Sequence, residues 1–445
     1  MATKTCTPES IAAFLRNGPA NAAAIVKALG TSQPVFSRNW ANTPNGITIG
    51  ESRARQYAIR RQIQGVESVI PVYQVSVEGK INDIGDLTPL EGNSYVFHSP
   101  DGSNYKIYRG LPFFLSDLKP QGFLGRSVPR NHQDLGLPEN ILTWTDDDVL
   151  RYLVNRGKSL PGNLVLGNPS YVAFLRTNNE LNWFDVCVDS DKRATAYPFE
   201  VERAITDGSP GSSAGGEQPK FVVILDDTRN LIVKFSPPME ELNGRRWADL
   251  LACEHIAMDT LNDNAIPAAT STIFDAGGRR YLEVDRFDRK GRAGRLPMIT
   301  MSGLDGNLGL LDQKWTKVAS VLYERGQLSS DDRALIEVLD LYGALIGNTD
   351  RHHGNIAFSW DQEENLRLLP VYDMLPMFYR PNQHGEVRDK IWAPVNIESL
   401  VLRHLPLALD LARQFWARVV RDSRISEQFE AVAAAHVDAL RHLDT

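Results

Sequence analysis

The sequence has few cysteines and no long apolar run, and these absences exclude several classes of protein. Only three cysteines occur in 445 residues, and Cys6, Cys187 and Cys253 are widely separated. This argues against a disulfide framework or a cysteine-ligated zinc site and favours reduced thiols. No apolar run reaches the roughly 18 residues of a membrane helix, and the N-terminal residues lack the layout of a signal peptide. We therefore expect a cytoplasmic protein without a membrane span.

Charge is distributed unevenly along the chain. The net charge is −7, but residues 1–64 contain eight lysines and arginines against two glutamates, which leaves the rest of the chain strongly acidic. A basic N-terminal segment on an acidic body indicates that only the first part meets a polyanion. The length allows two to four domains, and the composition is ordinary for a globular protein.

The first 64 residues predict a winged helix–turn–helix module that binds DNA. Thr7-Pro8-Glu9 can open a first helix, a second runs from about Asn21 to Leu29, and a third begins near Gln33 after a tight Gly30 turn. The stretch GITIGESRARQ can then form a small β wing. A small helical domain without a ligand is the alternative. The predicted DNA-binding residues are Gln33, Ser37, Arg38, Asn39, Arg53 and Arg55.

The remainder predicts an α+β body with two lobes and a cleft between them. Alternating β-branched stretches between residues 66 and 110 predict an antiparallel β subdomain, followed by an amphipathic helix opened by Thr145 or Asp146. FVVILDD and NLIVKFSPP read as paired strands, RWADLLACEHIAMDTLND as a long helix, and TSTIFDAGGRRYLEVDRFDR as two more strands. Helices dominate after residue 330. The predicted domains are 1–64, 65–150 (β subdomain), 151–300 (β-rich lobe) and 301–445 (all-helical lobe).

Two stretches in the β-rich lobe have features of a phosphate site. SPGSSAGGEQPKF, at residues 209–221, is a Ser/Gly-rich loop that leads into a strand, although it does not match the G-x-x-x-x-G-K-[ST] motif. Lys234 ends an apolar strand and is followed by a helix that contains Glu254, an order found around nucleotide phosphates in protein kinases. A flexible loop without a ligand, and a lysine exposed at a sheet edge, are the alternatives.

A third stretch, IGNTDRHHGNIAF, completes the pattern. Asp350 and Asn355 have the D-x-x-x-x-N spacing of a kinase catalytic loop, and the apolar run LRLLPVYD predicts a strand that ends in Asp373. Few, hard oxygen ligands favour Mg²⁺. Zinc is disfavoured, because the side chains of adjacent His352 and His353 diverge and H-E-x-x-H is absent.

These runs together resemble the HipA family of bacterial serine/threonine kinases, the toxins of a type II toxin–antitoxin class. GNTDRHHGN with LPVYD is similar to the catalytic and metal-binding pair of that family, SSAGGEQPK to its phosphate loop, IVKFSPP to its lysine strand, and VDRFDR and PFFLSDLKPQG to further family motifs. Fused to a helix–turn–helix, such a kinase resembles the YjjJ (HipH) branch.

The resemblance implies roles for single residues. Asp350 would be the catalytic base, Asn355 and Asp373 would bind Mg²⁺, and Ser213, or its neighbour Ser212, would be self-phosphorylated, which switches the kinase off. The implied ATP-binding residues are Ser213, Ala214, Gly215, Gly216, Glu217, Gln218, Lys220, Lys234, Glu254 and His353.

Three functions are compatible with this pattern. The first is an ATP- and Mg²⁺-dependent protein serine/threonine kinase that phosphorylates itself and a protein substrate and inhibits growth. The second is a DNA-binding regulator whose kinase-like body senses nucleotide without turnover, although an intact Asp350 argues against it. The third is a small-molecule kinase.

The built-in DNA-binding module also puts in question whether a separate antitoxin exists. In addition, Pro219 stiffens the phosphate loop.

Overall fold

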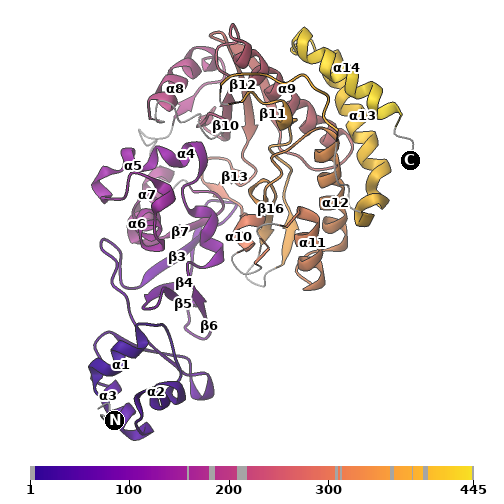
Figure 1. Cartoon of the computed structure of the whole chain (residues 1–445). Helices are drawn as coiled ribbons and strands as arrows, with labels where there is room; N and C mark the ends of the chain where they lie inside the picture. Colours follow the sequence, from indigo (N-terminus) through magenta and orange to yellow (C-terminus); the bar gives the residue numbers. More distant parts are fainter. Residues whose placement is uncertain are drawn as a thin grey trace. The chain divides into compact units, whose positions relative to one another are not determined.

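The chain divides into two compact units (Figure 1). Unit 1 comprises Met1–Ser76, Lys80–Lys119 and His132–Glu180, and unit 2 comprises Val77–Gly79, Pro120–Asn131 and Leu181–Thr445. The computed structural model describes residues 6–157, 160–179, 186–207, 218–305, 309–310, 313–360, 365–382, 384–393 and 399–442.

Unit 1 begins with three short helices and a two-stranded hairpin, which we call the N-terminal module (residues 1–64). Its elements are α1 (Pro8–Leu15), α2 (Ala22–Leu29), α3 (Gln33–Trp40), β1 (Gly46–Ile49) and β2 (Gln56–Ile59). Thr7 caps α1 in a capping box with Ser10, Asn21 caps α2, and Gly30 ends α2 in the left-handed conformation. The positions predicted for these helices are confirmed.

A five-stranded antiparallel sheet forms the rest of unit 1. Its strands, in the spatial order β6-β5-β4-β3-β7, are β3 (Ile70–Val75), β4 (Ile81–Leu90), β5 (Ser94–His98), β6 (Tyr105–Arg109) and β7 (Leu164–Leu166). Helices α6 (Asp146–Arg156) and α7 (Gly167–Asn179) pack with it, and Thr145 caps α6. The predicted antiparallel sheet is confirmed. Residue 150 lies inside α6, so the sheet subdomain continues past this predicted boundary to β7 and α7.

The N-terminal module shares backbone hydrogen bonds and apolar packing with this sheet. The Glu91 N–H donates to the Ile59 carbonyl oxygen at 2.8 Å, which continues β2 onto the end of β4. Ile49 and Ala58 of the hairpin form one buried cluster with Leu90 and Val96 of the sheet. The module and the sheet therefore fold around a common apolar contact.

The central sheet of unit 2 lies between two helices. Its order is β11-β12-β10-β9-β8, with bounds β8 (Cys187–Val188), β9 (Lys220–Leu225), β10 (Arg229–Phe235), β11 (Ser271–Ala276) and β12 (Arg279–Asp285). Helix α8 (Arg193–Asp207) and helix α9 (Leu242–Asp263) pack on the sheet. The two strand pairs and the long helix predicted here are confirmed.

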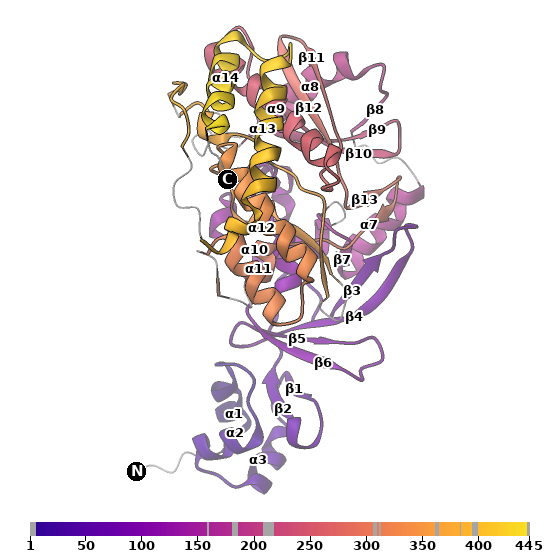
Figure 2. The same cartoon turned by 90° about the vertical axis from the view of Figure 1, so that its right-hand side faces the viewer.

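The C-terminal half of unit 2 is mainly helical. Helix α13 packs against α12, α14 and α9 (Figure 2). These elements are α10 (Met301–Asp305), α11 (Trp315–Glu324), α12 (Ser330–Leu345), α13 (Leu405–Arg421) and α14 (Glu427–Arg441). Smaller elements of unit 2 are α4 (Gly122–Arg126), α5 (Val128–Asn131), β13 (Arg289–Lys290) and β14 (Gly294–Arg295).

The expectation of an all-helical lobe from residue 301 is wrong. Strands β16 (Ala357–Trp360) and β17 (Leu366–Leu368) form a three-stranded sheet with β15 (Ile299–Thr300). Both strands are very short, so each shows too few alternations to be recognised by a period of two. Strand β16 begins directly after the D-x-x-x-x-N stretch.

Candidate active site

Lys234 is buried on the α9 face of the central sheet. Strand β10 is internal, between β9 and β12, and side chains alternate between the two faces of a strand. Val233 and Phe235 pack in the apolar cluster beneath α8, which contributes Tyr197. Lys234 therefore points the other way, and the residue is only 5% exposed. The alternative of a solvent-exposed lysine at a sheet edge is wrong.

The Lys234 ammonium lies between two carboxylates, and we call these three residues the ion cluster. Its Nζ is 2.5 Å from Oε1 of Glu254, which α9 supplies, and it also contacts the Asp373 carboxylate. Glu254 is 1% exposed, whereas the Asp373 side chain is 29% exposed. The ion cluster is therefore closed on the Glu254 side and open to ligands on the Asp373 side.

Electrostatics in the ion cluster follow from burial and from the short contacts. Burial by itself lowers the pKa of Lys234, but Asp373 and Glu254 outweigh it and raise that pKa. Burial raises the pKa of Glu254 to about 6 in spite of the adjacent lysine. Burial also opposes ionisation of Asp373, yet Lys234 and Lys220 hold its pKa well below the ordinary range. Asp373 is thus the carboxylate that stays charged at neutral pH and below.

Lys220 adds a second cation beside the ion cluster. It is the first residue of β9 and lies directly opposite Lys234 in the antiparallel pairing of β9 with β10. Residues directly opposite in such a pair project to the same face of the sheet. Gln218, two residues earlier, donates from Nε2 to the carbonyl oxygen of Phe235 at 2.6 Å. This hydrogen bond ties the end of the predicted phosphate loop to the end of β10.

The central residues of the predicted phosphate loop lie outside the described residues. These are Ser212, Ser213, Ala214, Gly215, Gly216 and Glu217. Their predicted roles in nucleotide binding and self-phosphorylation therefore stay predictions. Only Gln218 and Lys220 of that set have described positions, and both lie close to the end of β10.

Asp373 reaches the ion cluster from an irregular segment. The sequence predicted a strand that ends in Asp373, but β17 ends at Leu368. Val371 pairs with Ala268 in an isolated parallel bridge, and Asp373 then adopts a φ of +53°. A positive φ is uncommon for a residue with a side chain, and aspartate is among those that adopt it most readily. The turn at this position directs the carboxylate toward Lys234.

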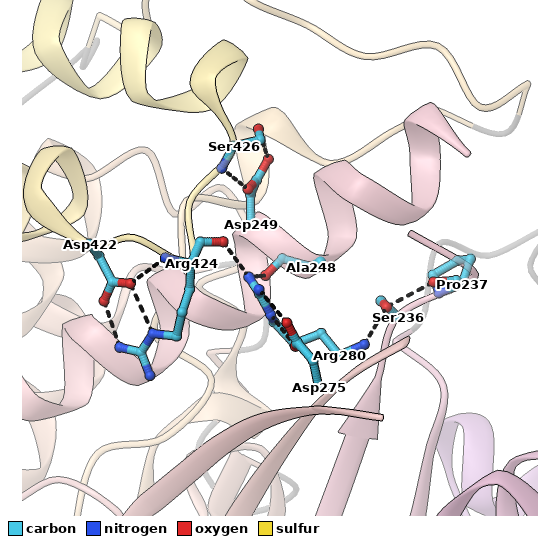
Figure 3. Close-up of polar contacts among 9 residues, drawn as sticks. All are labelled: Ser236, Pro237, Ala248, Asp249, Asp275, Arg280, Asp422, Arg424 and Ser426. Atoms are coloured by element: carbon cyan, nitrogen blue, oxygen red, sulfur yellow. Dashed lines mark hydrogen bonds and ion pairs between the residues drawn. The ribbon is translucent and has the colours of Figure 1, made fainter. Parts of the chain in front are cut away.

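A buried polar network fixes the helix that carries Glu254 (Figure 3). Arg280 of β12 donates from Nη1 to the carbonyl oxygens of Ala248 on α9, at 3.3 Å, and of Arg424, at 2.6 Å. Asp249 of α9 accepts hydrogen bonds from the backbone N–H and the hydroxyl of Ser426, at 2.8 and 2.6 Å. Helix α9 is therefore connected both to the sheet and to the turn between α13 and α14.

The loop around Asp350 is organised by its own amide side chains. Helix α12 is followed by Gly347 with a φ of +81°. The Asp350 N–H donates to Oδ1 of Asn348 at 3.0 Å, and the Asp350 carbonyl oxygen accepts from Nδ2 of Asn355 at 2.9 Å. The Asp350 carboxylate is partly exposed and has no hydrogen-bond or ion-pair partner among the described residues. The backbone of this aspartate is thus held while its carboxylate remains available.

Asn348 connects this loop to the segment of Asp373. It is fully buried, and its Nδ2 donates to the Asp373 carbonyl oxygen at 3.4 Å. Sequence reasoning did not select Asn348, although it stands two residues before Asp350 in the stretch that attracted attention. An asparagine next to a glycine in a polar run was the signal available in the sequence. The structure thereby links the D-x-x-x-x-N loop to the ion cluster.

Arg351 and His353 support the loop from inside. The Nε atom of Arg351 donates to Oδ1 of Asp340 at 2.9 Å, and its guanidinium also reaches the Asn348 carbonyl. His353 is buried, and its Nε2 lies 2.7 Å from the carbonyl oxygen of Gln313. This position gives His353 a role in holding the loop, and its predicted ATP contact stays a prediction.

The donor atoms of the site fit a magnesium–nucleotide complex. Mg²⁺ prefers oxygen ligands, which the Asp373 carboxylate and the Asn355 amide oxygen supply. Because Asn355 uses its Nδ2 for Asp350, its Oδ1 remains to accept a cation. Lys234 and Lys220 are the cations that phosphates require. Among the described residues, no group of three or more His, Cys, Asp and Glu side chains has the arrangement of a metal site.

The residues predicted to bind DNA are mostly on the surface of the N-terminal module. Gln33, Ser37 and Arg38 are exposed along α3. Asn39 is half-buried and donates from Nδ2 to the Val35 carbonyl oxygen at 2.9 Å, so it is the least available of the α3 set. Arg53 and Arg55 are exposed in the connection between β1 and β2.

A search of the described residues finds no helix with the length and apolarity needed to cross a membrane.

Known protein families match parts of both units. The family described as "YjjJ-like toxin, middle domain" matches residues 66–175, and the family described as "HipA-like C-terminal domain" matches residues 212–440. The protein "Toxin YjjJ" from Escherichia coli (strain K12) is 34% identical over 438 residues, which cover 97% of each chain. The likeness to that protein therefore includes most of the N-terminal module.

Two solved structures align with this chain, and the first shows a related fold. A chain of the Shewanella oneidensis MR-1 toxin–antitoxin complex of HipA, HipB and operator DNA aligns with a TM-score of 0.52 and 16% identity, covering 83% of this chain and 95% of its own length. The Helicobacter pylori proinflammatory kinase CtkA aligns with 50% of this chain and 87% of its own length, at 12% identity. Its TM-score is 0.34.

Proposed function

This chain belongs to the HipA-like toxin family, in the branch of YjjJ, and from this membership we propose that it is an ATP- and Mg²⁺-dependent serine/threonine protein kinase. In this proposal the enzyme transfers phosphate to a protein substrate and thereby inhibits growth. The reaction would take place in the cytoplasm, where ATP and Mg²⁺ are present.

The observation that carries the proposal is the connection between the ion cluster and the Asp350 loop. Phosphoryl transfer depends mainly on positioning and on stabilisation of charge, and less on covalent chemistry. Lys234 is fixed by Glu254 to hold phosphates, and Asp350 has a free carboxylate that can accept the proton of a substrate hydroxyl. Asp373 and Asn355 would hold Mg²⁺, which when bound neutralises negative charge on the phosphates.

Self-phosphorylation on the phosphate loop is part of the proposal, with Ser213 as the acceptor and Ser212 as the alternative. The loop leads directly to Lys220, which lies beside Lys234 on the sheet. A phosphoserine adds a charge of about −2 and can pair with cations. A phosphate on the loop would compete with nucleotide phosphates for the same two lysines, which supports a switch to an inactive state.

We also propose that the N-terminal module binds DNA. Three helices followed by a two-stranded hairpin, with Arg38 exposed on the third helix, support this part of the proposal. In the Shewanella structure operator DNA is in complex with HipA and HipB. Here the DNA-binding module would belong to the same chain as the kinase, so a separate antitoxin is not needed for contact with DNA.

Radiolabelled ATP tests the kinase proposal. The full-length protein is incubated with Mg²⁺ and γ-labelled ATP, beside Asp350→Ala, Ser213→Ala and the control Thr349→Ala, which changes an exposed side chain in the same loop. We expect label on the wild type and on Thr349→Ala, none on Asp350→Ala, and reduced or relocated label on Ser213→Ala by mass spectrometry. Tight ATP binding without label on any variant would instead identify a nucleotide-sensing regulator.

A further inference from the structure

Unit 1 contains a cavity that the proposed kinase and DNA-binding activities do not use. Its volume is about 620 Å³, which lies in the range of small-molecule sites. The N-terminal module supplies half of the lining residues and the β4–β6 part of the sheet supplies the other half. The lining residues are Asn17, Gly18, Pro19, Ala54 and Gln56 from the module, and Gly92, Ser94, Tyr105, Ile107 and Arg109 from the sheet.

Two polar side chains of this lining, the exposed Arg109 and the half-buried Gln56, have no partner among the described residues. The Arg109 guanidinium and the Gln56 amide make no hydrogen bond or ion pair with any described residue. Ser94, which is 2% exposed, places a further hydroxyl at the wall of the cavity, where it donates to the Gly92 carbonyl oxygen at 3.2 Å. An arginine with free donors and an amide in the same lining are suited to bind a carboxylate or a phosphate.

The charge around the cavity also favours an anion. None of the lining residues is an aspartate or a glutamate. Arg53 and Arg55, which are also predicted to bind DNA and are not part of the lining, are exposed on either side of the lining residue Ala54. Apolar surface is present as well, because Tyr105 and Ile107 alternate with Lys106 along β6 and line the cavity together with Arg109.

Direct contacts join the two halves of the cavity wall. The Tyr105 hydroxyl donates to the Ala54 carbonyl oxygen at 3.2 Å, which joins the sheet to the module across the cavity. Gly92 packs directly on the backbone of Asn17 and Gly18: a Cβ built at Gly92 would lie 2.4 Å from the Gly18 nitrogen. A side chain at position 92 is therefore excluded, and the two halves of the lining are held at a set distance.

We infer that this cavity binds a small organic anion, with its carboxylate or phosphate on Arg109 and Gln56 and its apolar part against Tyr105 and Ile107. A DNA backbone is a poorer fit, because the cavity is concave and the Ser94 hydroxyl is buried at its wall. The ligand would contact the N-terminal module and the sheet at once. This inference does not depend on the kinase activity.

Calorimetry with three probes of the same shape tests the inference on the full-length protein. Benzoate carries a carboxylate, phenyl phosphate carries a phosphate, and benzyl alcohol carries no charge. We expect at least one of the anions to bind and benzyl alcohol not to bind, and the tighter anion identifies the class of acid. Arg109→Gln should weaken binding about tenfold or more, because a charge-assisted hydrogen bond is lost.

Lys106→Gln is the matched control, since Lys106 is the neighbouring cation of β6 on the opposite face, 5.5 Å from the ring centre of Tyr108. It should leave the affinity for the anion unchanged, and hydrogen exchange should slow on ligand addition at residues 17–19, 54–56 and 105–109. Equal binding by wild type and Arg109→Gln, or no binding of either anion at millimolar concentration, would overturn the inference. So would a loss of DNA affinity in Arg109→Gln without anion binding by the wild type, which would assign Arg109 to a DNA surface.

Discussion

Lys220 and Lys234 face each other across the pairing of β9 and β10, with both side chains on the side of the sheet that α9 covers. Like charges directly opposite each other destabilise a strand pair. The two carboxylates of the ion cluster compensate for this repulsion, so the lysines can be kept together on one face of the sheet.

Substituting Lys234 and Lys220 one at a time should distinguish a contribution to the free energy of unfolding from a contribution to ATP binding. Lys234→Met leaves Glu254 and Asp373 close together without a cation, so we expect unfolding in urea to show a loss of about 3 kcal/mol. Lys220→Met removes a like charge, so the free energy of unfolding should be nearly unchanged while the Kd for ATP rises about tenfold. Equal destabilisation by both substitutions would contradict this division of roles.

Gly343→Ala should impair the Asp350 loop although alanine favours helices. A Cβ at this position of α12 would lie 2.6 Å from Cδ of Arg351, whose guanidinium binds Asp340 and the Asn348 carbonyl. In an exposed helix the change would stabilise by about 1 kcal/mol. Here we expect a lower unfolding midpoint and a large loss of self-phosphorylation, with ATP affinity nearly unchanged. Normal activity in this variant would show that the position of Arg351 does not matter.

His436 should make the stability of unit 2 depend on pH. Its ring stacks on Trp416 at 4.1 Å, its Nε2 lies 2.5 Å from the Tyr379 hydroxyl, and burial lowers its pKa to about 4. Between pH 6.5 and 4 the unfolded chain therefore binds a proton that the folded chain does not, so stability is lost as the pH falls. From pH 7.5 to 5 this loss is about 2 kcal/mol.

His436→Gln should make this pH dependence shallower by that amount, as measured by urea unfolding at the two pH values. His384→Gln, at an exposed histidine, is the control for the loss of an imidazole. A slope that remains unchanged in His436→Gln would show that other groups cause the acid sensitivity.

DNA binding by the N-terminal module should depend on salt and on Arg38. Phosphate contacts release counterions, so the affinity should fall by orders of magnitude between about 50 and 200 mM salt. Arg38→Ala should weaken binding about tenfold in a gel-shift or anisotropy assay, whereas Arg441→Ala, at an exposed arginine of α14, should not. Affinity that is independent of salt would remove DNA from the account of this protein.

Much of the fold could be predicted because its signals are local. Thr7 and Asn21 cap helices through neighbours three residues away, and the apolar alternation of β9 and β10 marks two strands around a turn. Strands β16 and β17 were missed because their few residues carry no readable period. Their existence depends on pairing with β15, more than fifty residues away in the chain.

The residues of the candidate site were easier to predict from the sequence than the contacts between them. Lys234, Glu254 and Asp373 come from a strand, a helix and an irregular segment, and their meeting depends on tertiary packing. The same holds for Asn348, whose side chain joins two loops, and for the register that sets Lys220 opposite Lys234. Motif spacing indicates the chemical types of these residues, but their contacts depend on the packed structure.

The hydrogen bond between Glu91 and Ile59 and the buried contact of Ile49 with Leu90 would oppose evolutionary loss of the N-terminal module. A gene product shortened to begin after residue 64 would present Leu90 and Val96 to water and would leave the end of β4 without its neighbour. Loss of the first 64 residues would therefore be opposed by the lower solubility of what remains, independently of any ligand that those residues bind.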